Sequence, residues 1–363
     1  MQRKKLLIFP FNLLSHYLRC ITLAKNYPEY DVWFASSAEY DSFVKLAGFN
    51  TFNVESFDPI RVMACSRVFN FKWLNEQDIL RVYRSQVNAI RELKPELVMG
   101  DTSPTLKMAS EHTHVKYVAL MNGYMTKYYS RVRKVSRTHY SYQYVSRLPN
   151  RVGDFITSLA EQKAFKAIHQ PFRILRKKLN LKKISSYLDE LEGDENLICD
   201  DPDLFPQKNM PTNYRFIGSL FYVSSDRETI LLSALDQAKP TICVSMGSSG
   251  EWDKFSFLSD NRYNFLNIIV AGDLHRTIKG DHIHYKEFVN LDEVLPYCRL
   301  LVCHGGNGTI CLGIKHKVPM LCLTSHFEQE WNVQMLEEKG FGKLINEAPQ
   351  PLVDKAVMPY QPV

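Results

Sequence analysis

Long hydrophobic runs and paired cysteines are missing from this sequence of 363 residues. No apolar stretch approaches the roughly 18 to 20 uninterrupted residues that a membrane-spanning helix needs, so we do not expect an integral membrane protein. The apolar run at the N-terminus is interrupted by Asn12, Ser15 and His16 before a signal-peptide core could form, and we interpret it as a buried strand. The eight cysteines include no C-x-x-C pair, and half of them lie in apolar stretches, which favours reduced thiols and a cytoplasmic location.

Low-complexity tracts and an excess of one charge along the whole chain are also missing. With 45% hydrophobic, 12% aromatic and 23% charged residues, the composition is that of a globular protein, which excludes disorder of the whole chain. The net charge of +6 is uneven, because residues 131–187 contain 14 Lys or Arg against two acids and the remainder is acidic. This distribution favours one basic module on an acidic frame over a uniformly basic nucleic-acid-binding protein.

The length predicts two domains, because a domain usually has about 100 to 200 residues. Short apolar runs alternate with helical patterns in both halves of the chain, which is typical of α/β proteins with parallel, doubly wound, Rossmann-like sheets. We expect an N-terminal domain over residues 1–205, a proline-containing linker over 206–228, a second domain over 229–345 and a tail over 346–363. The predicted strands are Lys5–Pro10, Asp31–Ala35, Thr51–Val54, Glu96–Gly100, Val115–Leu120, Thr241–Met246, Asn267–Ala271, Leu300–Cys303 and Pro319–Thr324.

A buried strand that ends at Cys303 leads into a glycine-rich turn, which is the most informative stretch of the sequence. In such a turn, unpaired backbone N–H groups and the positive end of the next helix face one point, and glycines let a ligand come close. The turn therefore predicts an anion site in which a histidine adds a donor to a phosphate oxygen. The structural alternative is a tight turn around a core histidine. The residues of the turn are His304, Gly305, Gly306, Asn307, Gly308 and Thr309.

A second glycine-containing turn, with Gly247 and Ser248, follows another strand of the same half. Two such turns side by side suit a diphosphate. Neither turn matches the G-x-x-x-x-G-K-[ST] pattern, and no lysine is suitably placed, so hydrolysis of a nucleoside triphosphate is disfavoured.

His16 and Asp101 are the candidate catalytic residues of the first half. His16 follows the loop after the first strand, and Asp101 ends the fourth, so a parallel sheet places both at its carboxyl edge. There, a carboxylate beside an imidazole can fix the tautomer of a general base. The alternatives are a packing histidine and an aspartate that caps a helix before Pro104.

Taken together, these residues resemble family 1 glycosyltransferases of the two-domain GT-B architecture, which include plant, animal and macrolide-modifying members. The resemblance is strongest from Thr241 to Gly342. It is carried by the turn at His304, by Val318-Pro319 fourteen residues later, and by Glu328-Gln329 and Asn332. It implies that His304 and the N–H groups of the turn hold the donor diphosphate, that Glu328 and Gln329 bind the sugar hydroxyls, and that His16 and Asp101 are the general base and its partner.

The chain departs from this family at several positions. Phe288 stands where many members stack a Trp on the nucleobase, and Leu291 replaces a following Gln. Leu312 replaces the Glu that commonly binds the ribose hydroxyls, which makes a dTDP-sugar an alternative donor to a UDP-sugar. Members usually continue with further helices after the stretch that matches 341–345, so the Pro-rich residues 346–363 indicate a short or truncated member.

The basic segment 131–187 interleaves arginines and lysines with tyrosines and ends in a basic amphipathic stretch. A peripheral contact with a membrane surface, an acidic acceptor, or a solvated helical face beside the acceptor each explain this pattern. Aromatic and basic residues interleaved in this way can also stack nucleic-acid bases, but we do not expect a nucleic-acid partner.

The sequence thus predicts an inverting glycosyltransferase that needs no metal or other cofactor. It would move a hexose from a UDP- or dTDP-sugar to a small-molecule or lipid hydroxyl. Two alternatives remain open. One is a nucleotide-sugar epimerase of the same architecture, and the other is a degenerate, non-catalytic binding protein, which Leu291, Leu312 and the short C-terminus favour.

Overall fold

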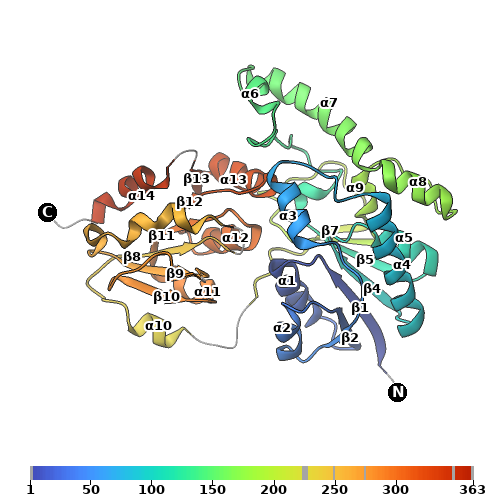
Figure 1. The fold of residues 1–363 in the computed structure, drawn as a ribbon, viewed down its shortest axis with the longest axis horizontal. Helices are drawn as coiled ribbons and strands as arrows, with labels where there is room; N and C mark the ends of the chain where they lie inside the picture. The colour runs from blue at the N-terminus through green and yellow to red at the C-terminus, as the bar shows by residue number, and fades with distance from the viewer. Residues whose placement is uncertain (1–2, 223–227, 248–249, 274, 346–347, 361–363) are drawn as a thin grey trace. The chain divides into compact units, whose positions relative to one another are not determined.

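The computed structural model describes residues 3–222, 228–247, 250–273, 275–345 and 348–360. The chain divides into two compact units, Met1–Tyr222 (unit 1) and Val223–Val363 (unit 2). Each unit contains one sheet whose paired strands are all parallel (Figure 1). The α/β class with two Rossmann-like sheets, predicted from the alternating pattern, is confirmed.

Unit 1 is built on a seven-stranded sheet, as far as the structure describes the chain, in the order β3-β2-β1-β4-β5-β6-β7. The neighbouring strands β1 and β4 end together, because Pro10 pairs with Asp101. Residues that follow these strands therefore share one edge of the sheet. The strands are β1 (Lys4–Pro10), β2 (Tyr30–Ala35), β3 (Asn50–Phe52), β4 (Leu97–Asp101), β5 (Lys116–Met121), β6 (Glu195–Ile198) and β7 (Tyr214–Phe216).

Helices cover both faces of the unit 1 sheet. Met99 of β4 belongs to a core shared with Ile21 of α1 and Val44 of α2, whereas the next residue, Gly100, faces Leu106 of α5. Since successive side chains of a strand point to opposite faces, α5 covers the face opposite α1 and α2. The helices are α1 (Leu14–Ala24), α2 (Asp41–Leu46), α3 (Pro59–Arg67), α4 (Glu76–Leu93), α5 (Leu106–Thr113), α6 (Tyr142–Val145), α7 (Asn150–Ile168), α8 (Gln170–Lys178) and α9 (Tyr187–Glu190).

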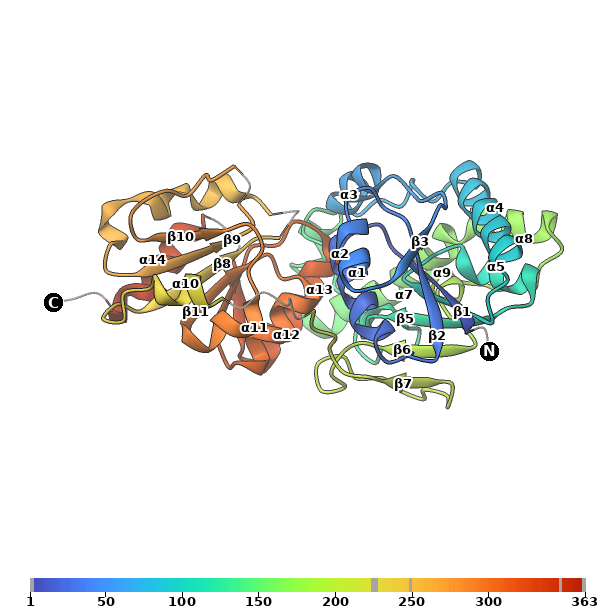
Figure 2. The same cartoon turned by 90° about the horizontal axis from the view of Figure 1, so that it is seen from below.

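Unit 2 has a six-stranded sheet among the residues described, in the order β10-β9-β8-β11-β12-β13. Figure 2 shows β10, β9, β8 and β11 lying side by side. Ser245 at the end of β8 pairs with Cys303 at the end of β11, so the turns after both strands are neighbours. The strands are β8 (Thr241–Ser245), β9 (Asn267–Ala271), β10 (Ile283–Lys286), β11 (Cys298–Cys303), β12 (Met320–Cys322) and β13 (Gly342–Leu344).

The unit 2 sheet is also covered on both faces. One face packs Val244 and Val302 against Val353 and Val357 of α14, while on the other face Gly313 of α12 lies against Met320. The helices are α10 (Thr229–Ser233), α11 (Leu291–Val294), α12 (Asn307–Lys315), α13 (Phe327–Lys339) and α14 (Pro349–Val357).

The unit boundaries differ from the predicted domain boundaries. β7 lies within the predicted linker 206–228 and completes the first sheet, and the two units divide after Tyr222. Residues 349–357, which were predicted to belong to a tail, form α14 and pack into the unit 2 core. Prolines were the reason for both predictions, but the prolines at 349 and 351 begin a helix, a position where the missing N–H costs nothing.

Candidate functional site

His16 and Asp101 come together at the carboxyl edge of the unit 1 sheet. Asp101 ends β4, and His16 lies in the first turn of α1, which follows β1 after a short loop. Nδ1 of His16 lies 3.0 Å from Oδ1 of Asp101. The Asp101 side chain is fully buried, while 15% of the His16 side chain remains exposed. No described residue pairs with Nε2 of His16, so the second ring nitrogen is available to another group.

Arg19 completes this group, and the sequence did not predict it. It lies one helical turn after His16, and its Nε and Nη2 atoms pair with the two carboxylate oxygens of Asp101. Nη1 of Arg19 donates to Oδ1 of Asn122, which follows β5, at 2.6 Å. Nη2 lies 3.2 Å from Nδ1 of His16. The i, i+3 spacing of His16 and Arg19 on a helix was the signal that could have found this contact.

The Asp101 carboxyl is ionised at neutral pH. Burial alone would raise its pKa, but the Arg19 guanidinium and the His16 ring hold that pKa well below its usual range. Burial would in turn lower the pKa of Arg19, and the Asp101 carboxylate raises it well above its ordinary value. The site is therefore a buried carboxylate shared between an arginine, which is always charged, and a histidine, which can take up a proton.

In unit 2, His304 lies between the two predicted glycine turns. Its Nδ1 lies 3.4 Å from the carbonyl oxygen of Ser245. Gly247 has a φ of +59°, and a Cβ there would lie 2.9 Å from Cε1 of His304. A Cβ on Gly306 would overlap Nε2 of the same ring. At these two positions glycine makes room for the imidazole, whereas the sequence suggested only room for a ligand.

Burial lowers the pKa of His304, although its contact with the Ser245 carbonyl opposes the shift. Without a bound anion, the His304 ring is therefore neutral near pH 7, with one nitrogen as a donor and the other as an acceptor. A neutral histidine donor avoids the cost of a buried charge when no anion is bound. Ser248, which was predicted to belong to this site, lies outside the described residues.

The turn after β11 opens α12 as predicted. Gly306 is the N-cap, and Asn307, Gly308 and Thr309 form the first turn, in which backbone N–H groups have no partner within the helix. Two residues of α13 hold this turn. Nδ2 of Asn332 donates to the Gly305 carbonyl at 3.1 Å, and a Cβ on Gly305 would lie 2.7 Å from Cγ2 of Val333. Both the φ of +81° and the short distance to Val333 therefore favour glycine at position 305.

Glu328 and Gln329 lie in the first turn of α13, and they differ in environment. Glu328 is half-buried. Gln329 is 3% exposed, and its Oε1 accepts from the backbone N of Ser325 at 2.7 Å and from the Ser325 hydroxyl at 3.1 Å. The Gln329 carbonyl thus fixes the start of its own helix, and its role towards a sugar stays a prediction.

Phe288 follows the carboxyl end of β10 by two residues and is half-buried. It lies at the same edge of the sheet as the two glycine turns, because all paired strands of unit 2 are parallel. The expected role in stacking a nucleobase is compatible with this position and is not tested by it.

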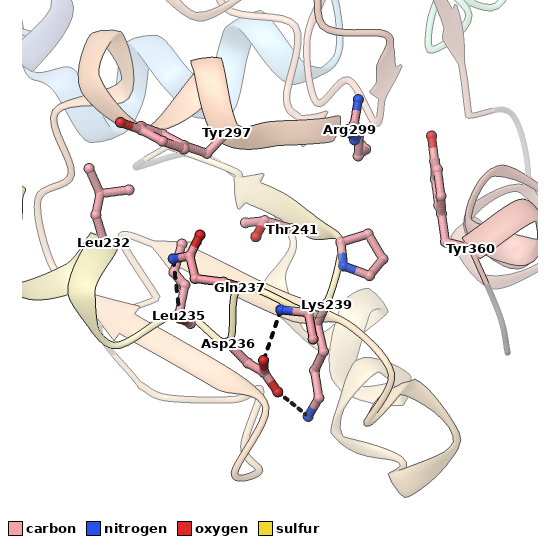
Figure 3. A pocket seen from close by; sticks show the side chains of 11 residues that line it. Leu232, Leu235, Asp236, Gln237, Lys239, Thr241, Tyr297, Arg299 and Tyr360 are labelled. Atoms are coloured by element: carbon pink, nitrogen blue, oxygen red, sulfur yellow. Dashed lines mark hydrogen bonds and ion pairs between the residues drawn. The ribbon is translucent and has the colours of Figure 1, made fainter.

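A surface hollow of unit 2 lies at the opposite edge of that sheet. Its lining includes Pro240 and Thr241, where β8 begins, and Tyr297 and Arg299, where β11 begins (Figure 3). Nζ of Lys239 lies 3.8 Å from the Asp236 carboxylate within it. The hollow is therefore separate from the glycine turns, which follow the other ends of these strands.

Three further properties bear on the predictions. Within the described ranges, no three His, Cys, Asp or Glu side chains gather in a way that could hold a metal ion. No helix in the described ranges has the length and hydropathy to cross a membrane. The eight cysteines are free thiols, seven of them buried.

Comparisons with known sequences connect this arrangement to sugar transfer. The sequence matches no family model. It is similar to a PGL/p-HBAD biosynthesis glycosyltransferase of Mycobacterium tuberculosis, with 22% identity over 345 residues, 92% of this chain and 78% of that protein. A PGL/p-HBAD biosynthesis rhamnosyltransferase of Mycobacterium bovis is 20% identical over 356 residues, 95% of this chain and 77% of that protein. Another Mycobacterium bovis relative, named an inactive PGL/p-HBAD biosynthesis glycosyltransferase, is 24% identical over 247 residues, 65% of this chain and 64% of that protein.

Solved structures share the fold along nearly the whole chain. The spinosyn rhamnosyltransferase SpnG has a TM-score of 0.69 at 14% identity, covering 99% of this chain and 91% of that chain. The Streptomyces glycosyltransferase SsfS6, complexed with thymidine diphosphate, has a TM-score of 0.66 at 14% identity, covering 98% of this chain and 91% of that chain.

Proposed function

We propose that this chain, which belongs to the family 1 glycosyltransferases of GT-B architecture, moves a sugar from a nucleotide diphosphate sugar to an acceptor hydroxyl with His16 as the general base. The observation that carries this proposal is the contact between His16 and Asp101. A buried, ionised carboxylate lies 3.0 Å from Nδ1 of the ring, and Nε2 has no partner among the described residues.

Proton transfer follows from this geometry. Asp101 accepts a hydrogen bond from Nδ1 of His16, which leaves the lone pair of Nε2 to take the proton of the acceptor hydroxyl. The oxygen then attacks the anomeric carbon from the side opposite the departing diphosphate, so that the configuration is inverted. Asp101 stabilises the imidazolium that results, although Arg19 shares its charge.

Donor binding is assigned to unit 2. The leaving diphosphate would be held by His304, by the N–H groups of Gly305 to Thr309 and by the turn with Gly247 and Ser248, which are donors fixed before the charge develops. We assign no metal to this site, because backbone and imidazole donors supply the stabilisation. Glu328 and Gln329 would bind the sugar hydroxyls, and Phe288 would stack on the base.

The donor we favour is a dTDP-sugar, with a UDP-sugar as the alternative. Leu312 replaces the usual partner of the ribose hydroxyls, a structural neighbour is complexed with thymidine diphosphate, and one relative is named a rhamnosyltransferase. A 6-deoxyhexose such as rhamnose is therefore a candidate for the transferred sugar. The acceptor is a small-molecule or lipid hydroxyl.

A binding experiment tests the donor site. Ligand that binds only the folded state raises the unfolding temperature, and at a fixed concentration a tighter ligand raises it more. We expect dTDP to stabilise the protein more than dTMP, ADP or GDP, and His304→Ala to abolish this response. His16→Ala is the matched control, because it lies in the other unit and should keep the response. Equal responses to all nucleotides, or an unchanged response in His304→Ala, would remove the donor assignment.

The two alternatives are separated by simple controls. A nucleotide-sugar epimerase alters the sugar without an acceptor, whereas a transferase consumes the donor only when an acceptor is present. A degenerate binding protein would respond to dTDP but release no nucleotide from any donor. The similarity to a relative that is named inactive supports this second alternative.

A further inference from the structure

Helix α7 exposes an apolar stripe to solvent. Val152, Phe155, Ile156 and Leu159 follow helical spacing, so they share one face, and they are between 42% and 66% exposed. An amphipathic helix normally turns such a stripe towards the core. Here the apolar face of the helix is directed away from the protein.

The opposite face of α7 is fixed in the protein, so this orientation is not arbitrary. Gly153, Thr157 and Phe165 are buried on that side. Arg133 is also buried, pairs with Glu161 of α7 and donates to the backbone carbonyls of Tyr124 and Thr126. Turning the stripe inward would break this buried ion pair.

Two exposed tyrosines precede α7 in the chain. Tyr140 and Tyr144, just before α7, are 78% and 64% exposed. A Cβ on Gly153 would lie 3.4 Å from the Val145 carbonyl oxygen, so α6 packs on the protein-facing side of α7 and leaves the apolar stripe uncovered. Figure 1 shows α6 and α7 projecting beyond the sheet of unit 1. The four apolar residues of the stripe are called the α7 face below.

Basic residues border the α7 face. Lys163 and Lys166 continue the same side of the helix and are exposed, as are Arg147 and Arg151 near its start. The acids Asp154 and Glu161 are both neutralised, by Lys134 and Arg133 respectively. The surroundings of the stripe are therefore positively charged.

We propose that the α7 face binds the surface of an anionic lipid bilayer. Apolar side chains of an interfacial helix enter the boundary between headgroups and acyl chains, and lysines attract anionic lipid. A second copy of the chain fits this surface less well, because two α7 faces would bring like charges together. None of these residues belongs to the groups assigned to sugar transfer, so the proposal does not depend on them.

Sedimentation with lipid vesicles tests this surface. We expect the full chain to pellet with vesicles of phosphatidylcholine containing about a third phosphatidylglycerol, less with phosphatidylcholine alone, and less again as salt is raised. The double variant Phe155→Ser, Leu159→Ser removes two apolar side chains, and Lys163→Glu with Lys166→Glu reverses the charge. Each should weaken partitioning by about tenfold or more.

Matched controls distinguish binding through the α7 face from nonspecific adsorption to the vesicles. Ile60→Ser with Ile230→Ser removes two apolar side chains that are 80% and 86% exposed elsewhere, and Lys343→Glu with Lys355→Glu makes the same charge change on unit 2. These variants should partition like the wild type. Stabilisation by dTDP should be the same in all variants, so failure of the surface and failure of the donor site remain distinguishable.

Three results would overturn the proposal. The first is a wild-type chain that stays in the supernatant with anionic vesicles, and the second is an equal loss of partitioning in the control variants. The third is a dimer, detected by analytical ultracentrifugation, that the Phe155→Ser, Leu159→Ser variant dissociates while no vesicle binding occurs. That result would assign the α7 face to a second copy of the chain.

Discussion

Asp101 is bound by two cationic or potentially cationic side chains at once. Arg19 occupies both of its oxygens, while His16 approaches one of them. Arg19 compensates the charge of the buried carboxylate, and His16 adds a group that can exchange a proton. Arg19 therefore contributes to the stability of the site, whereas His16 is the candidate for its chemistry. The contribution of Arg19 can be measured by unfolding, without an activity assay.

Removing the Arg19 side chain should destabilise unit 1 strongly. Arg19→Ala leaves Asp101 buried without its cationic partner, and loss of one member of a buried pair costs about 3–5 kcal/mol. Arg19→Lys keeps the charge but not the two-pronged contact, so its loss should be smaller. Urea unfolding measures both free energies. Arg61→Ala, which removes an exposed pair with Asp78, should cost no more than about 1 kcal/mol, and an equal cost in Arg19→Ala would contradict this account.

Acid should reduce the difference in unfolding free energy between the wild type and Asp101→Asn. The pKa of Asp101 is depressed in the folded protein, so its contribution to stability is complete above the ordinary aspartate pKa of about 4 and is lost as the pH falls below it. The gap in unfolding free energy should shrink below pH 4, by at most about 1.4 kcal/mol per pH unit. Urea titrations at pH 5, 4 and 3 measure this slope, and a constant gap would show that the carboxylate is not responsible.

Gly306 and Gly308 should differ sharply in their tolerance of alanine. A Cβ at Gly306 overlaps the His304 ring, whereas a Cβ at Gly308 meets no atom within 4 Å. Gly306→Ala should cost about 1–3 kcal/mol and weaken stabilisation by dTDP, because the imidazole must move. Gly308→Ala should leave the unfolding free energy unchanged or raise it, because it lies inside α12. Thermal unfolding compares them, and equal losses would remove the steric explanation.

At the scale of elements, most strands of the two sheets were predictable from the sequence. β1, β4, β5, β8, β9 and β11 lie where the alternating pattern indicated strands. β3 and β12 have three residues each and were also predicted, whereas β7 and β13, of the same length, were not. β7 and β13 each pair with the neighbouring parallel strand at the end of their sheet. α3 carries local signals of a helix start, because Asp58 caps it and proline begins it.

Helix α14 should be part of the unit 2 core rather than an appendage. Val353 is fully buried against the sheet, so Val353→Ala should destabilise unit 2 by about 2 kcal/mol through the lost methyl groups and the cavity. Lys355→Ala on the same helix is exposed and should change stability by less than about 0.5 kcal/mol. Chemical denaturation of both variants checks this, and an unaffected Val353→Ala would mean that α14 does not pack as described.

At the scale of the whole molecule, the features that depend on local spacing in the sequence were the ones that could be predicted. The two parallel sheets, the turn at His304 and the contact of His16 with Asp101 depend on motifs at strand ends, which a sequence displays. Arg19 was missed because it lies inside α1 rather than at the end of a strand, so no motif at a strand end marks it. The direction of the α7 stripe depends on tertiary contacts, because the buried pair of Arg133 with Glu161 determines which side of the helix faces the protein.

Acceptor-dependent release of nucleotide tests the central claim most directly. Purified wild type and His16→Ala would be incubated with dTDP-rhamnose or UDP-glucose, with and without a panel of small-molecule and lipid hydroxyl acceptors, and the released nucleoside diphosphate and the anomeric configuration of the product would be measured. We predict release only with donor and acceptor together, inversion at the anomeric carbon, and a loss of at least about 10²-fold in His16→Ala, which still binds dTDP. Release without an acceptor, a retained configuration, or a fully active His16→Ala protein would contradict the account.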